Sequence, residues 1–356
     1  MRLAEYLRYM VEAGGSDLHL KAGEPPVVRV DGLLHRTSFA PLPPDDTESL
    51  AMELLSEAKA IEFQDGHEAE AAFNMKDLGR FRVSVYRQRG SVSLAIRRVR
   101  SNIFDFEALH LPPGALGLAR ERRGLVLVTG PAGTGKTTTI AAMIGWMNEN
   151  RPAHIITIED PIEVIHEDMT SIVEQREVGT DTESYSAALR SAVRQDPDVI
   201  FIGEIRDRET AEGAIQAAET GHLVISTLHT LDATETVNRI IDLFPVEMHT
   251  QARISLAATL KGVLSQRLVP RSDGTGRVPA VEVLINTGRV AERIADPDQT
   301  HSIPELIAEG EYYGMQTFDQ ALVRLVSDDL ITIDAAIDIA TNPHDLKLAL
   351  QMAQLV

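Results

Sequence analysis

The sequence contains no cysteine, which excludes disulfides, iron–sulfur clusters and zinc sites built on thiolates. It also lacks any uninterrupted apolar run of about 18 residues, the length that a membrane-spanning helix requires. Its first residues include an acidic side chain and no continuous apolar stretch, unlike a signal peptide. We therefore expect a cytoplasmic protein with no membrane span of its own, which reaches the inner membrane only through a partner.

Basic side chains are scarce: 34 Lys and Arg face 53 Asp and Glu, and the net charge is −19. The first hundred residues are nearly neutral, so the acidic excess lies in the rest of the chain. Such a field repels nucleic acid at long range, and no basic run with interleaved aromatic residues offsets it. We expect no nucleic-acid partner, although an acidic excess also serves solubility alone.

A length of 356 residues is sufficient for two domains, and the pattern of apolar and polar residues changes after the first hundred residues. Residues 1–100 combine an amphipathic helix over 3–13 with alternating strand-like stretches and a hairpin turn at Asp31-Gly32, which predicts an α+β domain. Residues 101–123 contain clustered prolines and charges and are the predicted linker. In residues 124–356, apolar runs alternate with helical segments, which predicts an α/β domain with a mainly parallel sheet.

The predicted elements of the second domain are bounded by clear patterns. We expect strands at 125–129, 155–158, 199–202 and 223–226, and helices at about 136–148, 184–195, 208–219 and 233–242. The last third of the chain is expected to be helical, with a capping box that starts at Thr317.

One segment, from Gly130 to Thr137, matches the phosphate-binding pattern G-x-x-x-x-G-K-[ST] at every fixed position. It directly follows a predicted strand and precedes a helix, so backbone N–H groups and the helix dipole can bind phosphate oxygens. We expect Lys136 to neutralise the β- and γ-phosphates and the Thr137 hydroxyl to bind Mg²⁺. The complete set of expected nucleotide-binding residues in this segment is Gly130, Pro131, Ala132, Gly133, Thr134, Gly135, Lys136, Thr137 and Thr138. A dinucleotide-binding loop is excluded, because Thr138 occupies the place of the third glycine.

Two acidic segments follow predicted strands, where carboxylates of a parallel sheet face the ligand. The first is I-E-D-P-I-E, which ends at Glu163, and the second is an apolar strand followed by Gly203 and Glu204. The second segment resembles a Walker B element in which glycine replaces the usual magnesium-binding aspartate. His222 and His229 bracket the next strand, and this placement makes them candidates for contact with the γ-phosphate, although a single histidine is more often a packed or solvent-facing residue.

Together these motifs resemble those of the type II/IV secretion ATPases and, among them, the type IV pilus retraction ATPases (the PilT family). The stretch S-D-L-H-L at 16–20 is similar to the N-terminal signature, and residues 158–163 are similar to the Asp box. Residues 194–207 resemble the family's atypical Walker B, and residues 220–230 resemble its His box. Residues 314–320 (G-M-Q-T-F-D-Q) resemble a C-terminal signature of the retraction branch, so the resemblance covers nearly the whole chain.

The resemblance implies an α/β protein with an N-terminal PAS-like α+β domain and a RecA-like P-loop ATPase core with a helical C-terminus. It implies a homohexamer that uses ATP and Mg²⁺. Glu163 would orient or deprotonate the attacking water, Glu204 would act on Mg²⁺ directly or through water, and His229 would sense the γ-phosphate, with His222 also at the nucleotide. Arg82 and Arg97 match arginines that close onto the nucleotide, and their alternative role is a solvated strand face.

The implied activity is ATP hydrolysis that drives pilus retraction, pilin disassembly and twitching motility, with an inner-membrane platform protein as partner. The absence of cysteine favours this branch, because many pilus-extension ATPases carry a tetracysteine zinc module. However, residues 289–296 keep only the apolar spacing of the helix A-I-R-N-L-I-R-E of retraction ATPases. Two alternatives therefore stay open: a nucleotide-gated accessory subunit that acts with a paralogous pilus ATPase, and a related secretion ATPase. The acidic core argues against a DNA-translocating ring.

Overall fold

The computed structural model describes residues 2–30, 32–99 and 103–355, and the chain divides into two compact units. The first comprises residues 1–102 with the short segment 163–165, and the second comprises residues 103–162 and 166–356. Asp31 of the predicted hairpin turn and residues 100–102 at the predicted domain boundary lie outside the described residues.

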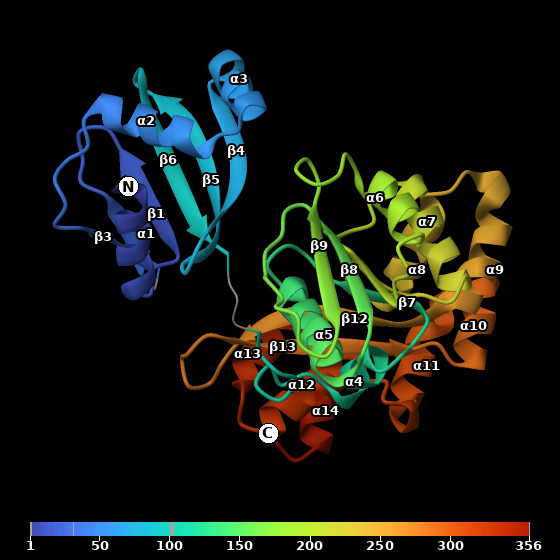
Figure 1. Cartoon of the computed structure of the whole chain (residues 1–356). Helices are drawn as coiled ribbons and strands as arrows, with labels where there is room; N and C mark the ends of the chain where they lie inside the picture. The colour runs from blue at the N-terminus through green and yellow to red at the C-terminus, as the bar shows by residue number, and fades with distance from the viewer. Residues whose placement is uncertain (1, 31, 100–102, 356) are drawn as a thin grey trace. The chain divides into compact units, whose positions relative to one another are not determined.

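The first unit is built on a six-stranded antiparallel sheet in the order β3-β2-β1-β6-β5-β4 (Figure 1). Alternate residues of these strands, such as Leu18, Val83 and Ile96, are buried in a core with α1 and α2, which explains the period-two pattern of the sequence. The predicted α+β character of the first hundred residues is confirmed. The elements of this unit are α1 Arg2–Glu12, β1 Asp17–Lys21, β2 Val27–Val30, β3 Leu33–Arg36, α2 Pro44–Leu54, α3 Glu57–Gly66, β4 Glu68–Met75, β5 Gly79–Gln88 and β6 Ser91–Arg98.

The second unit contains a seven-stranded mixed sheet in the order β13-β12-β7-β11-β10-β8-β9. Six strands run parallel and β13 pairs antiparallel with β12, so the chain has the predicted α/β architecture with a mainly parallel sheet. The central strands are buried on both faces, in keeping with their continuous apolar sequence. The strands are β7 Gly124–Thr129, β8 His154–Glu159, β9 Ile172–Glu177, β10 Val199–Ile202, β11 Leu223–Leu228, β12 Leu260–Pro270 and β13 Arg277–Ile285.

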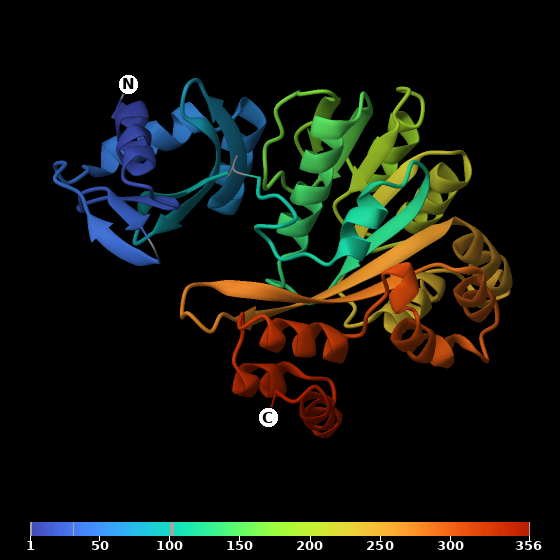
Figure 2. The same cartoon turned by 90° about the horizontal axis from the view of Figure 1, so that it is seen from below.

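Helices cover both faces of this sheet (Figures 1 and 2). Helices α4 and α5 pack on one face, α6 to α11 belong to the core on the other, and α12 to α14 pack beside β12 and β13. The helices are α4 Pro113–Ala119, α5 Lys136–Asn150, α6 Tyr185–Ala192, α7 Arg208–Glu219, α8 Ala233–Asp242, α9 His249–Thr259, α10 Gly288–Ala295, α11 Ile303–Glu309, α12 Phe318–Ser327, α13 Ile333–Ile339 and α14 Pro343–Met352. The capping box at Thr317 is formed as predicted.

Three sequence-based expectations differ from the structure. The predicted linker 101–123 is too long, because residues 103–123 belong to the second unit, where Ala115 and Leu118 of α4 are buried in its core. The last third of the chain is not purely helical, since it includes the long strands β12 and β13. Strand β9 was not expected, because an edge strand with the sequence I-V-E-Q-R-E carries little apolar signal.

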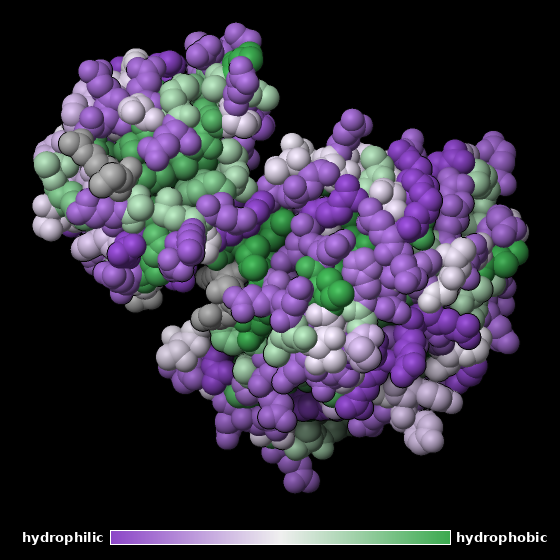
Figure 3. Space-filling model, viewed as in Figure 1, coloured by the Kyte–Doolittle hydropathy of each residue, from purple (hydrophilic) through white to green (hydrophobic). Residues whose placement is uncertain are grey.

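In the part of the chain that the structure describes, no helix is long and apolar enough to cross a membrane. The face of the second unit seen in Figure 3 is mainly hydrophilic, and its apolar side chains form small separate patches.

Candidate active site

The phosphate-binding loop connects the carboxyl end of β7 to the first turn of α5. Gly133 and Gly135 have φ values of 80° and 91°, a left-handed conformation that favours glycine. A β-carbon at Gly130 would lie 2.6 Å from the carbonyl oxygen of Gln266 on β12, so only glycine fits there. The two fixed glycines of the motif, Gly130 and Gly135, and the additional Gly133 therefore each have a local reason in the structure.

Lys136 is the first residue of α5, and its ammonium lies inside the loop. Its Nζ donates to the carbonyl oxygens of Gly130 at 2.6 Å and Pro131 at 3.0 Å, while the Thr134 hydroxyl donates to Pro131 at 2.9 Å. Thr137, the next residue of the helix, is exposed at its N-terminal turn. A cation and a helix N-terminus thus converge on one loop, which is the arrangement that binds phosphate.

Glu204 stands two residues beyond the carboxyl end of β10, and only 9% of it is exposed. Its Oε1 pairs with Arg206, and its Oε2 lies 3.4 Å from Nε2 of His229. The backbone that carries it is fixed, because Gly203 donates to Ile158 O at 2.8 Å and accepts from the Thr227 hydroxyl at 2.7 Å. The structure therefore brings the predicted residues Glu204 and His229 together.

Glu204 and His229 both line a cavity of about 370 Å³ at this edge of the sheet. The cavity also exposes two cations, Arg206 and Arg239, and the carboxylate of Glu235 on α8. The full lining is Glu204, Ile205, Arg206, Leu228, His229, Thr230, Glu235 and Arg239. The cavity therefore places a buried carboxylate beside two arginines, an arrangement that can hold water.

The acidic segment after β8 divides into a buried and an exposed part. Glu159 is buried and accepts hydrogen bonds from the Thr157 hydroxyl at 2.7 Å and Gln175 Nε2 at 3.1 Å, so its carboxylate connects β8 to β9. Glu163 follows Ile162, whose N–H donates to Glu177 Oε2 at 3.1 Å, and its own side chain is exposed. Of these two carboxylates, Glu163 is the one open to water.

His222 lies at the amino end of β11 and not beside the phosphate loop. Leu223 pairs with Gly124 and Leu228 with Thr129, so His222 and His229 are separated by the length of the strand, about 20 Å. Nδ1 of His222 lies 2.9 Å from Ala217 O at the end of α7. The structure therefore does not bring His222 to the phosphate loop of its own chain.

Arg82 and Arg97 are direct cross-strand partners on β5 and β6 of the first unit. Arg97 also faces Asp17 on β1, and its Nε donates to Asp17 Oδ1 at 2.7 Å. Burial raises the pKa of Asp17, but the hydrogen bonds from Ser16 and Arg97, together with nearby positive charge, bring this pKa below its ordinary value. The two arginines thus share one polar face of the sheet, and one of them has an acidic partner within its own unit.

Sequence reasoning missed several side chains of this region. Arg206 and Arg239 line the cavity, and Tyr185 on α6 reaches Gly203, as described below. Arg206 follows Glu204 by two residues, so the motif itself contained the signal. Tyr185 and Arg239 come from separate helices, and only the tertiary fold brings them to the site.

A buried carboxyl on β13 connects the phosphate loop to α8. Thr129, the residue before Gly130, donates to Ser265 Oγ at 3.1 Å, and Glu282 pairs with Ser265 and accepts from Ala233 N–H at 2.9 Å. Burial raises the pKa of Glu282 to about 7, against the opposing effect of the Ala233 hydrogen bond. Hydrogen bonds thus run from the last residue of β7 to the first residue of α8.

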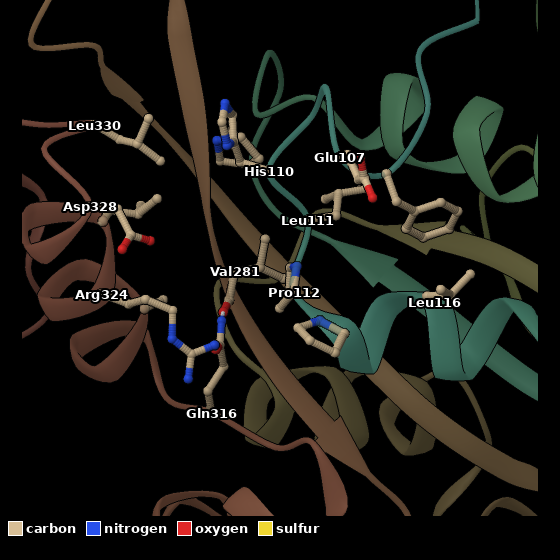
Figure 4. A pocket seen from close by; sticks show the side chains of 15 residues that line it. Glu107, His110, Leu111, Pro112, Leu116, Val281, Gln316, Arg324, Asp328 and Leu330 are labelled. Carbon is tan, nitrogen blue, oxygen red and sulfur yellow. Dashed lines mark hydrogen bonds between the residues drawn. The ribbon is translucent and has the colours of Figure 1, made fainter.

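A separate pocket of about 480 Å³ lies at the outer edge of β13 (Figure 4). Its polar side chains include Gln316, whose Nε2 donates to Val281 O at 2.7 Å and whose Oε1 accepts from Arg324 at 3.0 Å. The remaining lining is mostly apolar and comes from residues 106–116, β13, α12 and the segment after α12 that carries Asp328 and Leu330. The pocket contains none of the predicted site residues.

A phosphate loop between a strand and a helix, with a buried carboxylate and a histidine at a neighbouring strand end, defines a P-loop ATPase. The family described as "Type II/IV secretion system protein" matches residues 3–311. The chain therefore belongs to the type II/IV secretion ATPases and is an ATP-hydrolysing enzyme of the PilT type.

Individual relatives support this assignment along nearly the whole chain. The "Type IV pilus ATPase PilU" of Pseudomonas aeruginosa is 44% identical over 99% of this chain and 92% of its own length. The "Type IV pilus retractation ATPase PilT" of the same organism is 40% identical over 97% of this chain and 100% of its own. A solved structure, "Crystal Structure of the Pilus Retraction Motor PilT and Bound ADP", superposes with a TM-score of 0.88 at 44% identity, covering 96% of this chain and 98% of that one.

Proposed function

We propose that this protein is a homohexameric motor that hydrolyses ATP to drive type IV pilus retraction and twitching motility. The observation that carries the proposal is the match, over nearly the full length of both chains, to relatives named as pilus ATPases. The motor would work in the cytoplasm against an inner-membrane platform protein, without nucleic acid. Its first unit would be a PAS-like domain and its second a RecA-like core.

In this proposal the loop from Gly130 to Thr138 holds the phosphates, and Lys136 neutralises the β- and γ-phosphates. Mg²⁺ fits the donor chemistry of the site, because Thr137 offers an exposed hydroxyl and Glu204 a carboxylate, both hard oxygen ligands. Both oxygens of Glu204 already face Arg206 and His229, which favours contact with the ion through water. The ion would supply charge neutralisation on the phosphates.

The other proposed roles use groups of this chain alone. Glu163 would orient or deprotonate the attacking water. Its side chain is exposed and makes no hydrogen bond within the described residues. His229 would sense the γ-phosphate beside Glu204. Arg82 and Arg97 would contribute positive charge at the nucleotide phosphates when the two units move relative to each other. Arg97 would then give up its hydrogen bond to Asp17 and bind a phosphate instead.

A direct test of the motor is deletion of the gene and complementation with wild-type or Lys136→Ala protein, scored for twitching and for surface pili. Immobile cells with excess pili support retraction, whereas bald cells contradict it and indicate extension. Glu163→Gln protein should bind ATP but hydrolyse it about 10²–10⁴-fold more slowly. Wild-type turnover by that variant would remove Glu163 from the role of base.

A second candidate, an accessory nucleotide-gated subunit that acts with a paralogous motor, is favoured by one observation. Helix α10 replaces the polar residues expected of a retraction motor but still buries Val290 and Ile294. Purified protein alone separates the two candidates through phosphate release and light scattering. Robust turnover by an isolated hexamer supports the principal motor, and weak turnover that rises on addition of a paralogous ATPase supports the accessory subunit.

A further inference from the structure

Gly203 occupies the position of the usual Walker B aspartate, and the structure shows why a side chain is absent. Its φ is not among the left-handed values of this chain, so its backbone conformation does not require glycine. A β-carbon at this position would instead lie 2.8 Å from the Tyr185 hydroxyl and 3.3 Å from Ile158 O. The tyrosine hydroxyl therefore fills the space into which an aspartate at 203 would project.

Tyr185 is held in this place by its helix. It is the first residue of α6, directly after the N-cap Ser184, whose Oγ accepts from Ala187 N–H at 3.1 Å. Its ring packs against the apolar core between the sheet and α7. Both features direct the hydroxyl to the carboxyl ends of β8 and β10.

The surroundings of this hydroxyl are acidic. Burial, followed by the carboxylates of Glu204 and Asp160, raises the pKa of Tyr185 well above its ordinary value. The group therefore keeps its proton at every physiological pH. Within the described part of the chain the hydroxyl makes no hydrogen bond, so its proton is free to be donated toward the carboxylates or the water between them.

We propose that Tyr185 is a positioning residue for ATP hydrolysis, whose hydroxyl takes the hydrogen-bonding place of the missing aspartate and orients water at Glu204. An aspartate accepts hydrogen bonds, whereas a neutral tyrosine also donates one. A donor beside Glu204 can hold a water oxygen in place. Unlike an aspartate at position 203, it adds no further negative charge to those of Glu204 and Asp160. The inference rests on the proposed role of Glu204, and the variants below separate the two.

The first test is Tyr185→Phe, which removes the hydroxyl and keeps the ring. The value of kcat should fall about tenfold, as expected for the loss of one hydrogen bond to the reacting water. KM for ATP and the affinity for a Mg²⁺-bound, non-hydrolysable ATP analogue should change less than about twofold, because Tyr185 is not part of the phosphate loop. Tyr313→Phe, the same change at an exposed position, is the matched control and should keep wild-type values.

The second test is Gly203→Ala, which keeps the hydroxyl but displaces it. The expected loss in kcat is again about tenfold, and the double variant should be no slower than either single variant, since both remove the same interaction. The proposal would be overturned if the fold-loss in kcat of the double variant equalled the product of the two single losses. It would also be overturned if Tyr185→Phe kept the wild-type kcat. A lowered Tm of Tyr185→Phe with kcat unchanged would overturn it as well.

Glu204→Gln distinguishes failure of this inference from failure of the site. If Glu204→Gln retains wild-type turnover, the role of Glu204 is wrong and the role of Tyr185 fails with it. If Glu204→Gln is inactive while Tyr185→Phe is normal, only the inference about Tyr185 is overturned. Inactive Glu204→Gln with a selective kcat loss in Tyr185→Phe supports both.

Discussion

In the seven-stranded sheet, the amino ends of the parallel strands form one edge and their carboxyl ends form the other. Both edges carry polar side chains, but these side chains have different partners. At the amino edge, His222 lies near the end of α7, Arg151 donates to Glu121 O and Ala119 O, and Lys261 pairs with Glu121. At the carboxyl edge, Glu204, Arg206, His229, Glu235 and Arg239 line a cavity instead, and the phosphate loop follows β7 at the same edge. The polar side chains named at the amino edge bond to neighbouring loops and helix ends of the same unit. At the carboxyl edge, polar side chains face a cavity where a ligand can bind.

The largest expected contrast is between two lysines at opposite edges. Lys136→Ala should lower turnover by at least about 10²-fold, because it removes the cation that lies against the loop carbonyls of Gly130 and Pro131. Lys261→Ala removes a partly exposed ion pair with Glu121 at 3.6 Å and should leave turnover unchanged, at a stability cost under about 1 kcal/mol. Phosphate release and thermal unfolding of both variants measure the contrast, and equal losses of turnover would contradict it.

The next contrast uses two glutamates. If Glu204 has the proposed role, Glu204→Gln should bind ATP but hydrolyse it about 10²-fold more slowly, since an uncharged amide would supply no negative charge for Mg²⁺ or its water. Glu121→Gln makes the same change at the amino edge and should retain wild-type kcat. Binding of a fluorescent ATP analogue, measured beside turnover, separates a catalytic defect from a binding defect. Loss of binding in Glu204→Gln would mean that the carboxylate holds the site together rather than serves the reaction.

The two histidines that flank β11, His222 and His229, provide a smaller contrast at the two ends of one strand. His229→Ala should lower kcat about tenfold, because its ring lies 3.4 Å from Glu204. His222→Ala should leave kcat unchanged and cost about 1 kcal/mol of stability, through loss of the hydrogen bond to the end of α7. Steady-state kinetics and denaturant unfolding of the pair measure both effects. A kcat loss in His222→Ala would place it at a nucleotide, which in an assembly belongs to a neighbouring copy.

These histidines show how far the sequence could lead. The place of the phosphate loop in the fold was predictable, because the motif is one contiguous segment, and β7 and α5 lie on either side of it as expected. The motif around β11 predicted both histidines alike, but sheet polarity placed only His229 at the carboxyl edge. Tyr185 could not be predicted at all, since its distance from Gly203 depends on how α6 packs. The segment 103–123 was misjudged because prolines that begin α4 read as linker residues.

The last prediction concerns Glu282, a carboxyl that lies level with the phosphate loop yet serves the fold. Its ordinary pKa of 4.5 is raised to about 7 by burial, with Asp232 adding to this effect and Arg267 opposing it. Between these two pH values the folded protein keeps a proton that the unfolded chain releases, so the free energy of unfolding should fall as pH rises through that window. Above pH 7 the buried charge persists as a cost of about 3 kcal/mol.

Glu282→Gln mimics the protonated form and can still accept from Ala233 N–H. We therefore expect the variant to lose this pH dependence and to be more stable than the wild type at pH 8 by about 3 kcal/mol, but similar at pH 5. Urea unfolding at both pH values measures the difference, with the exposed Glu292→Gln as the matched control. Parallel stability curves for Glu282→Gln and the wild type would mean that the carboxyl ionises equally in both states. A carboxyl that fits this prediction would show that position at the carboxyl edge is not enough for a role in the reaction: Glu282 is buried and outside the cavity, whereas Glu204 lines the cavity.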